Sequence, residues 1–147
     1  MAERTDGSIE IAASPAGVMA VIADFEAYPQ WADGVREAAV LKSDGEGRPV
    51  LVSMHVVSGF VDTRYTLAYE YAPQDAGLSW ATEAASGALK SLEGEYVLEP
   101  VGDATLVTYR LTMEAAISLP GFLKRTAERT IVNTALGGLK KRVESRR

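Results

Sequence analysis

Cysteine is absent from the 147 residues, and histidine occurs only once, at position 55. The missing cysteine excludes disulfide frameworks, thiolate nucleophiles and every zinc or iron–sulfur site built on cysteine. A single imidazole cannot supply the two or three that most catalytic metal sites use. The sequence therefore predicts neither a bound metal ion nor another cofactor.

Long apolar segments are also missing. The sequence contains no uninterrupted run of about 18 apolar residues, so we expect no transmembrane helix. Residues Met1–Asp6 are polar, so no secretory signal is visible and a cytoplasmic location is expected. With 47% hydrophobic and 24% charged residues and no linker-like tract, residues 1–147 are expected to form a single globular domain.

Charge is distributed unevenly along the chain, whose formal net charge is −5. Up to Pro120 there are 7 basic and 18 acidic residues, whereas from Gly121 onward there are 8 basic and 2 acidic residues. Such a basic end is typical of a solvated helix face, and the alternative is a strip that contacts anionic lipid or nucleic acid. We expect no nucleic-acid binding, because the rest of the chain is acidic and no aromatic residues interleave with the basic ones for base stacking.

Two short helices are expected after an N-terminal strand. Residues 8–12 alternate in the manner of a strand. Ser14 and Pro15 are residue types that favour the N-cap and first position of a helix, and apolar residues follow them at helical spacing. The first helix is therefore expected over residues 15–25, and residues 26–34 are expected to form a second short helix or a turn that is broken around Tyr28-Pro29.

From residue 35 the apolar pattern changes from a helical period to alternation. Turn residues separate the alternating segments, which is typical of an antiparallel meander. A long helix is expected from Pro120 to about Arg146. These elements predict an α+β fold in which a curved antiparallel sheet of about seven strands wraps around the C-terminal helix and encloses a pocket. The six strands of the meander are expected over residues 35–42, 49–57, 62–71, 78–83, 88–99 and 105–115.

The two halves of the long helix differ in character. Apolar residues of the second half form a broad face, which we expect to pack on the sheet. At equivalent angles the first half carries Arg125, Glu128 and Arg129, so this half is expected beside a wetter region such as a cavity mouth. Gly137 and Gly138 each cost about 1 kcal/mol of helix propensity relative to alanine, which favours a close approach of the helix backbone to a strand.

Several segments resemble the START-like, Bet v 1-like superfamily, also described as the polyketide cyclase/dehydrase and lipid transport family. They are Ser14-Pro15, the run 21–31 (VIADFEAYPQW), the strand segment 94–100 (GEYVLEP) and the glycine-containing final helix. The Tyr-Pro-x-Trp pattern within 21–31 is similar to the bacterial coenzyme Q-binding branch. The resemblance covers residue 9 to about residue 144 and implies a helix-grip fold with a hydrophobic cavity. Members include lipid carriers, polyketide cyclases and quinone-binding proteins, so the fold does not set the function.

The candidate ligand-binding residues come from the apolar strand faces that point toward the predicted helix. Alternation places residues of one parity on one face, so aromatic residues of neighbouring strands are expected together. Tyrosine hydroxyls could orient the polar head of an apolar ligand, and the alternative is plain core packing. Thr130 and Asn133 are expected as polar contacts from the helix. The full set is Met54, Tyr65, Leu67, Tyr69, Trp80, Tyr96, Tyr109, Met113, Phe122, Thr130 and Asn133.

No residue is assigned a catalytic role. Arg64, Arg110 and His55 have the opposite alternation phase, so they are expected on the solvated outer face of the sheet. A cavity arginine of a cyclase would require an inward shift of Arg110. Asp24 and Glu26 are two residues apart and do not face each other on a helix, so they are expected to cap a turn.

Three functions fit this sequence. The first is a carrier or sensor that binds a lipid, an isoprenoid quinone or a polyketide-like molecule in the cavity. The second is a polyketide cyclase or aromatase-type enzyme, and the third is a regulatory interaction protein that uses the basic helix. The oligomeric state stays open between monomer and homodimer. Residues 119–123 (LPGFL) beside Lys124 and Arg125 resemble an amphipathic contact, so transient docking on a membrane surface and ligand access are expected at the helix start.

Overall fold

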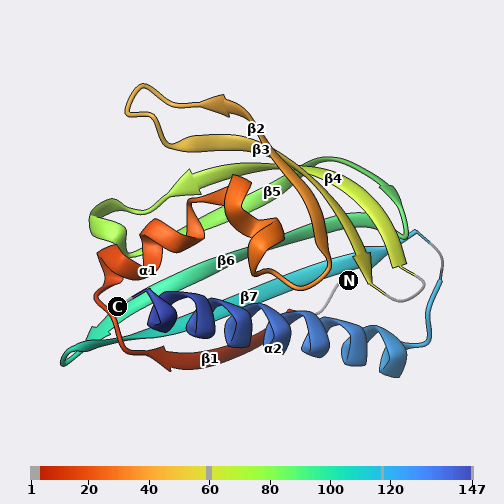
Figure 1. The fold of residues 1–147 in the computed structure, drawn as a ribbon. Coiled ribbons are helices and arrows are strands. Elements are labelled where there is room, and N and C mark those ends of the chain that lie inside the picture. Colours follow the sequence, from red (N-terminus) through yellow and green to blue (C-terminus); the bar gives the residue numbers. More distant parts are fainter. Residues whose placement is uncertain (1–3, 59–60, 117, 147) are drawn as a thin grey trace.

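The protein folds as one curved sheet with its helices on a single face (Figure 1). The computed structural model describes residues 4–58, 61–116 and 118–146. In chain order the elements are β1 (Thr5–Ile11), α1 (Pro15–Ile22), η1 (Phe25–Gln30), β2 (Val35–Ser43), β3 (Pro49–Ser58), β4 (Val61–Tyr71), η2 (Pro73–Asp75), β5 (Gly77–Gly87), β6 (Leu89–Val101), β7 (Ala104–Ala115) and α2 (Gly121–Ser145).

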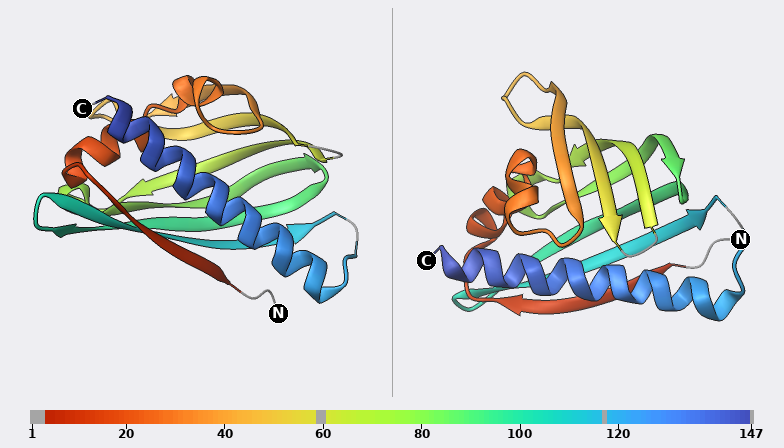
Figure 2. Two further views of the ribbon diagram at one scale, coloured as in Figure 1. Left: turned by 60° about the horizontal axis from the view of Figure 1, so that its bottom comes forward. Right: turned by 45° about the vertical axis from the view of Figure 1, so that its right-hand side comes forward.

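The sheet has seven antiparallel strands in the order β1-β7-β6-β5-β4-β3-β2. Strands β2 to β7 form a meander, and β1 pairs with the last strand, β7. Between the two edge strands β1 and β2, the chain crosses one face as α1 and η1. In both views of Figure 2, α2 runs along β1 and β7 on that same face. The α+β helix-grip fold expected from the sequence is confirmed.

Helix α1 begins where the sequence predicts and ends earlier than predicted. The Ser14 hydroxyl accepts a hydrogen bond from the Gly17 N–H at 3.2 Å, and Pro15 occupies the first position. The helix ends at Ile22 because Asp24 has the non-helical angles φ −87° and ψ 68°. The chain then re-forms a turn of 3₁₀-helix, η1. The Tyr28 hydroxyl donates to the Ile22 carbonyl at 2.6 Å and ties η1 to the end of α1.

The second half of α2 packs on β1 through the apolar face that the sequence predicts. Val132, Leu136, Leu139 and Val143 are buried there. The close approach depends on Gly7 of β1, because a Cβ atom at that position would lie only 2.8 Å from Cγ1 of Val132. Helix α2 can therefore sit directly on the strand backbone at this point.

The glycine pair of α2 has a different neighbour from the one expected. Nothing lies within 4 Å of a Cβ atom built on Gly137, and the nearest atoms to one on Gly138 belong to Trp31, at 3.7 Å. The expected close approach to a strand is therefore wrong. The backbone of α2 instead faces the indole that follows η1, and this contact joins the helix to the segment between α1 and β2.

Glu128, in the first half of α2, is buried, and the expectation that it lies beside a wet region is wrong. Its side chain is only 1% exposed, although the sequence pattern places it beside a wet region. Its carboxylate accepts hydrogen bonds from the Thr5 hydroxyl at 3.0 Å and from the Met113 N–H at 3.3 Å, and Lys124 Nζ lies 3.7 Å away. Strand β1 begins at Thr5, opposite Leu111, so Met113 lies beyond the end of the β1–β7 ladder. The helix carboxylate provides the acceptor that this buried N–H needs.

We predict that Glu128→Ala lowers the free energy of unfolding by about 1–3 kcal/mol, because it leaves the buried Met113 N–H without an acceptor. Urea denaturation measures the change. The matched control is Arg129→Ala, an exposed neighbour on the same helix, for which we expect a change within about 0.5 kcal/mol. Equal stability of the two variants would contradict the role assigned to Glu128.

Candidate ligand-binding site

Eight of the residues that the sequence selects lie on the face of the sheet that the helices cover. Seven of them are buried in the core, and Tyr65 is partly buried against it. They come from β3, β4, β5, β6 and β7, so alternation alone brings them to one face. The eight residues are Met54, Tyr65, Leu67, Tyr69, Trp80, Tyr96, Tyr109 and Met113.

Aromatic rings of this face form one connected group, the aromatic cluster, which consists of Phe25, Tyr69, Trp80, Tyr96 and Tyr109. The centroid of the Trp80 ring lies 5.9 Å from Tyr69, 5.7 Å from Tyr96 and 5.5 Å from Tyr109. Tyr96 and Tyr109 meet edge to face at 4.8 Å, and Phe25 of η1 lies 4.6 Å from Tyr69. These separations are within the range in which aromatic pairs attract each other. The cluster therefore joins η1 to four strands of the sheet.

Strand register explains why these rings meet. Tyr69 lies directly opposite Trp80 in the β4–β5 pair, and Tyr96 lies opposite Tyr109 in the β6–β7 pair. Trp80 itself lies opposite Gly94 of β6. A Cβ atom on Gly94 would be 3.0 Å from Cζ2 of Trp80, so the glycine leaves the space that the indole uses to reach the next two strands. A glycine in mid-strand is the sequence signal for such a close approach, and the sequence reasoning did not use it.

Four polar atoms of the aromatic cluster have no hydrogen-bond partner among the described residues. They are Nε1 of Trp80, which is buried, and the hydroxyls of Tyr69, Tyr96 and Tyr109, which do not count among the fully buried unpaired atoms. Other tyrosines differ, since the Tyr71 hydroxyl donates to the Pro49 carbonyl at 2.7 Å. A buried polar group without a partner is costly, so the Trp80 N–H, with three unpaired hydroxyls in the same cluster, marks a place where a bound molecule would be stabilising.

Burial also changes the acidity of these tyrosines. Desolvation, followed by the neighbouring tyrosines, holds the pKa of Tyr69 well above its usual value, and Tyr109 and Tyr96 are shifted in the same direction for the same leading reason. Burial raises the pKa of Tyr65 to about 12. The hydroxyls therefore stay protonated at neutral pH and can donate hydrogen bonds.

Three predicted residues, Phe122, Thr130 and Asn133, lie away from the aromatic cluster. Thr130 and Asn133 are exposed on α2, because the buried stripe of this helix runs through Glu128, Val132 and Leu136 instead. Phe122 is 65% exposed at the start of the helix. The structure therefore does not group these three side chains with the buried residues of the covered face, and their contact with a ligand stays a prediction. Ala127, Ile131 and Ala135 are the helix residues that pack against the core next to this stripe.

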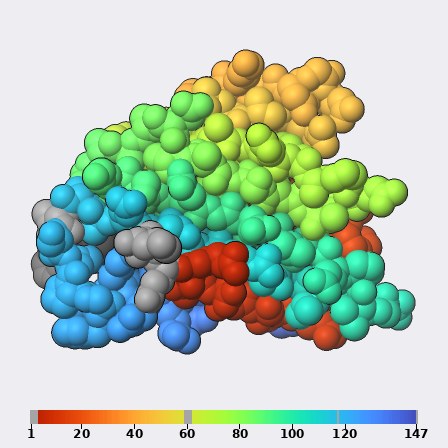
Figure 3. Space-filling view, turned by 180° about the vertical axis from the view of Figure 1, so that it is seen from behind, coloured from red at the N-terminus to blue at the C-terminus, as the bar shows by residue number. Residues whose placement is uncertain are grey.

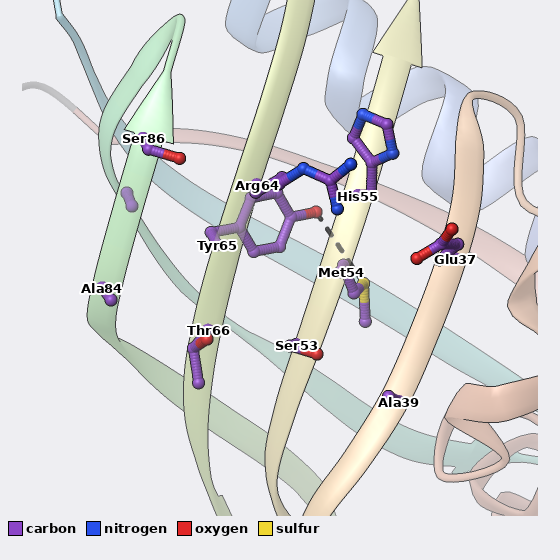
Figure 4. Close-up of a pocket in the computed structure, with 11 residues that line it drawn as sticks. Glu37, Ala39, Ser53, Met54, His55, Arg64, Tyr65, Thr66, Ala84 and Ser86 are labelled. Carbon is purple, nitrogen blue, oxygen red and sulfur yellow. Dashed lines mark hydrogen bonds between the residues drawn. The ribbon is translucent and has the colours of Figure 1, made fainter.

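Two hollows lie outside the aromatic cluster. One, of about 300 Å³, is lined mainly by outer-face residues of β2 to β5, and Figure 4 shows Arg64 and His55 side by side there. His55 Nε2 lies 2.8 Å from Asp62 Oδ1. The other hollow, of about 470 Å³, lies between α1 and the segment that includes η2.

Figure 3 shows the molecule from behind, with the sheet strands in front. Arg110 pairs with Glu95, its neighbour on β6, at 3.7 Å. The three residues Arg64, Arg110 and His55 thus have the outward placement that alternation predicts. Glu26, at the turn after α1, accepts a hydrogen bond from the Val40 N–H at 3.2 Å. Within the described ranges, no group of three or more acidic or histidine side chains is placed to hold a metal ion.

The sequence profile of the family described as polyketide cyclase / dehydrase and lipid transport matches residues 2–144. The protein belongs to this family. The START-like resemblance noted in the sequence is thereby confirmed, and the narrower likeness to the coenzyme Q-binding branch stays a prediction. No curated protein matches the sequence.

Solved structures share the fold of this family member at low sequence identity. A START superfamily protein from Mycobacterium smegmatis is 23% identical, with a TM-score of 0.90 over 98% of this chain and 99% of the other. The Zhui aromatase/cyclase from Streptomyces sp. R1128 is 15% identical, with a TM-score of 0.81 over 99% and 96%. A STAR-related lipid transfer protein from Xanthomonas axonopodis is 18% identical, with a TM-score of 0.70 over 96% and 85%.

We predict that Gly94→Ala destabilises this family member by about 1–3 kcal/mol, because the new Cβ atom would press on the β7 backbone and on the Trp80 ring. Fluorescence of Trp80 in a Trp31→Phe background should shift to longer wavelength as the indole becomes solvated. The control is Gly45→Ala, whose Cβ atom meets nothing within 4 Å. Unchanged emission and stability for Gly94→Ala would show that the glycine does not position the indole.

We further predict that the tyrosines lose their protons at the same alkaline pH at which the protein unfolds. All six have a raised pKa in the folded protein, with burial as the first cause. In the unfolded chain a tyrosine loses its proton near pH 10. The contribution of the raised tyrosine pKa values to the free energy of unfolding is therefore complete below about pH 10 and is lost as the pH rises further. Phenolate absorbance and circular dichroism should change at the same pH. Several phenolates in a protein that is still folded at about pH 10 would contradict this prediction.

Proposed function

We propose that this protein binds a hydrophobic small molecule with a carbonyl oxygen, of the quinone or polyketide-like type, as a carrier or sensor. The ligand would lie between the sheet and α2, against the aromatic cluster. The observation that carries the proposal is the buried Trp80 N–H together with the hydroxyls of Tyr69, Tyr96 and Tyr109, none of which has a hydrogen-bond partner among the described residues.

The chemistry of these four atoms favours a ligand that accepts hydrogen bonds. The indole N–H can only donate, and tyrosines with raised pKa values keep their protons. A carbonyl oxygen accepts such bonds, while a planar conjugated body suits the faces and edges of the surrounding rings. The family description and the lipid transfer and cyclase descriptions of the similar structures support a ligand that is mainly apolar.

Binding of such a ligand requires that the rings of the aromatic cluster move apart, since they are in mutual contact. Met54 and Met113 are buried on the same face. Unbranched methionine side chains re-pack easily, so they supply adaptable walls for this movement.

Binding rather than catalysis is the role that the polar groups support. Cyclisation of a poly-β-keto chain needs a base to remove a proton. Glu128 is the buried carboxylate of the described residues, and Thr5, Met113 and Lys124 already engage it. A cyclase function would require Arg110 to point into the cavity, but this residue pairs with Glu95 on the outer face.

We predict that menadione binds more tightly than methylnaphthalene, which has a similar ring system without carbonyl oxygens. Quenching of Trp80 fluorescence in a Trp31→Phe background reports binding. Each hydrogen bond to a neutral carbonyl contributes about 1 kcal/mol, which corresponds to about fivefold in the dissociation constant. Tyr96→Phe and Tyr109→Phe should each weaken menadione binding by about that factor and leave methylnaphthalene binding unchanged.

The matched control for these variants is Tyr71→Phe, whose hydroxyl is bonded to the Pro49 carbonyl outside the aromatic cluster. It should not change the affinity for either compound. Equal binding of menadione and methylnaphthalene, or equal effects of all three tyrosine variants, would contradict a carbonyl-selective site. Absence of binding by both compounds would contradict the aromatic cluster as the site.

A further inference from the structure

Exposed apolar side chains gather at the start of α2. Among the described residues, the large hydrophobic side chains that are exposed are Leu41, Val101, Leu119, Phe122 and Leu123. Three of these five lie within residues 119–123, with exposed fractions of 37% for Leu119, 65% for Phe122 and 46% for Leu123. Exposed apolar groups that are scattered singly need no explanation, whereas a contiguous group marks an interaction surface.

Basic residues surround this apolar group. Phe122, Arg125 and Arg129 are spaced by three and four residues, which places them on one face of the helix, and all three are exposed. The one acidic residue between positions 119 and 133 is Glu128, which is buried. The first turn of α2 contains no acidic residue. Cations near a helix N-terminus oppose the helix dipole, so this charge pattern does not serve the stability of the helix.

The position of the segment leaves it accessible. In both views of Figure 2, the start of α2 extends beyond the start of the β1 ribbon at one end of the molecule. The second half of the helix is the part buried on the sheet, through Val132, Leu136, Leu139 and Val143. The first turns therefore present their outer face to the surroundings while the rest of the helix holds them rigidly.

We propose that the start of α2 is a docking tip, formed by Leu119, Phe122, Leu123, Arg125 and Arg129, that binds reversibly to the surface of a bilayer containing anionic lipids. The apolar side chains would enter the boundary between head groups and acyl chains, and the arginines would contact lipid phosphates. This combination of a bulky apolar tip flanked by cations matches a lipid surface in both polarity and charge. Among the described helices, none has both the length and the apolar character needed to cross a bilayer.

The docking tip is independent of the proposed ligand. Its residues lie away from the aromatic cluster, and vesicle binding can be measured without any small molecule. Each arginine near an anionic surface strengthens partition by about fivefold, and burial of a largely exposed phenylalanine adds about tenfold or more. These factors describe an association that forms and dissociates readily rather than permanent anchoring.

The test is flotation of the purified protein with vesicles of phosphatidylcholine alone and of phosphatidylcholine mixed with phosphatidylglycerol, at low and high salt. We expect binding to the anionic vesicles at low salt, with loss at high salt because salt screens exposed charges. Phe122→Ser should weaken partition by about tenfold and Arg129→Gln by about fivefold. Melting temperatures equal to that of the unaltered protein would show that these exposed substitutions leave the fold intact.

The matched control is Leu41→Ser, since Leu41 is 56% exposed on β2 and lies next to Lys42, outside the docking tip. It should bind the anionic vesicles as well as the unaltered protein does. An equal loss for Leu41→Ser, equal binding to both kinds of vesicle, or no binding to the anionic vesicles at low salt would overturn the proposal. Self-association that Phe122→Ser abolishes, in place of vesicle binding, would assign the tip to a second copy of the chain and would also overturn it.

Discussion

The contact between Trp80 and Gly94 is the constraint on which the covered face of the sheet depends. The indole lies over β6 because the residue opposite it has no side chain, and a methyl group there would meet both the ring and the β7 backbone. From this position the ring reaches Tyr69, Tyr96 and Tyr109. One glycine thus allows an aromatic residue of β5 to connect strands on either side, and it brings four donor atoms into a single site.

Helix α2 is attached to the sheet in two physically different ways. Its second half lies on β1 through close apolar contact at Gly7, whereas its first half is held by the buried carboxylate of Glu128, which bonds to groups of both β1 and β7. A buried carboxylate with several donors is stable only when all of them are in place. Before this polar attachment along the chain, the large apolar residues within 119–123 remain at the surface.

Alternation in the strands was sufficient to predict the strand residues of the candidate site, because neighbouring side chains of a strand must point to opposite faces. The same reasoning placed Arg64, Arg110 and His55 on the outer face. It did not predict that Thr130, Asn133 and Phe122 are exposed, since a helix has no such binary choice and its rotation depends on what it packs against. It also placed Glu128 in a wet region, because a polar residue is normally exposed unless specific partners bury it.

The sequence by itself determined the kinds of element, their order, and which residues share a strand face or a helix stripe, since these follow from local periodicity and from residues such as Ser14 and Pro15. Only the tertiary structure decided which faces meet. That Trp80 faces Gly94, that α2 lies on Gly7 and that Glu128 accepts from the Met113 N–H of β7 all depend on the register of segments far apart in the chain. The same register decides whether a buried hydrogen-bond donor has an acceptor within reach. A local sequence pattern does not contain this information.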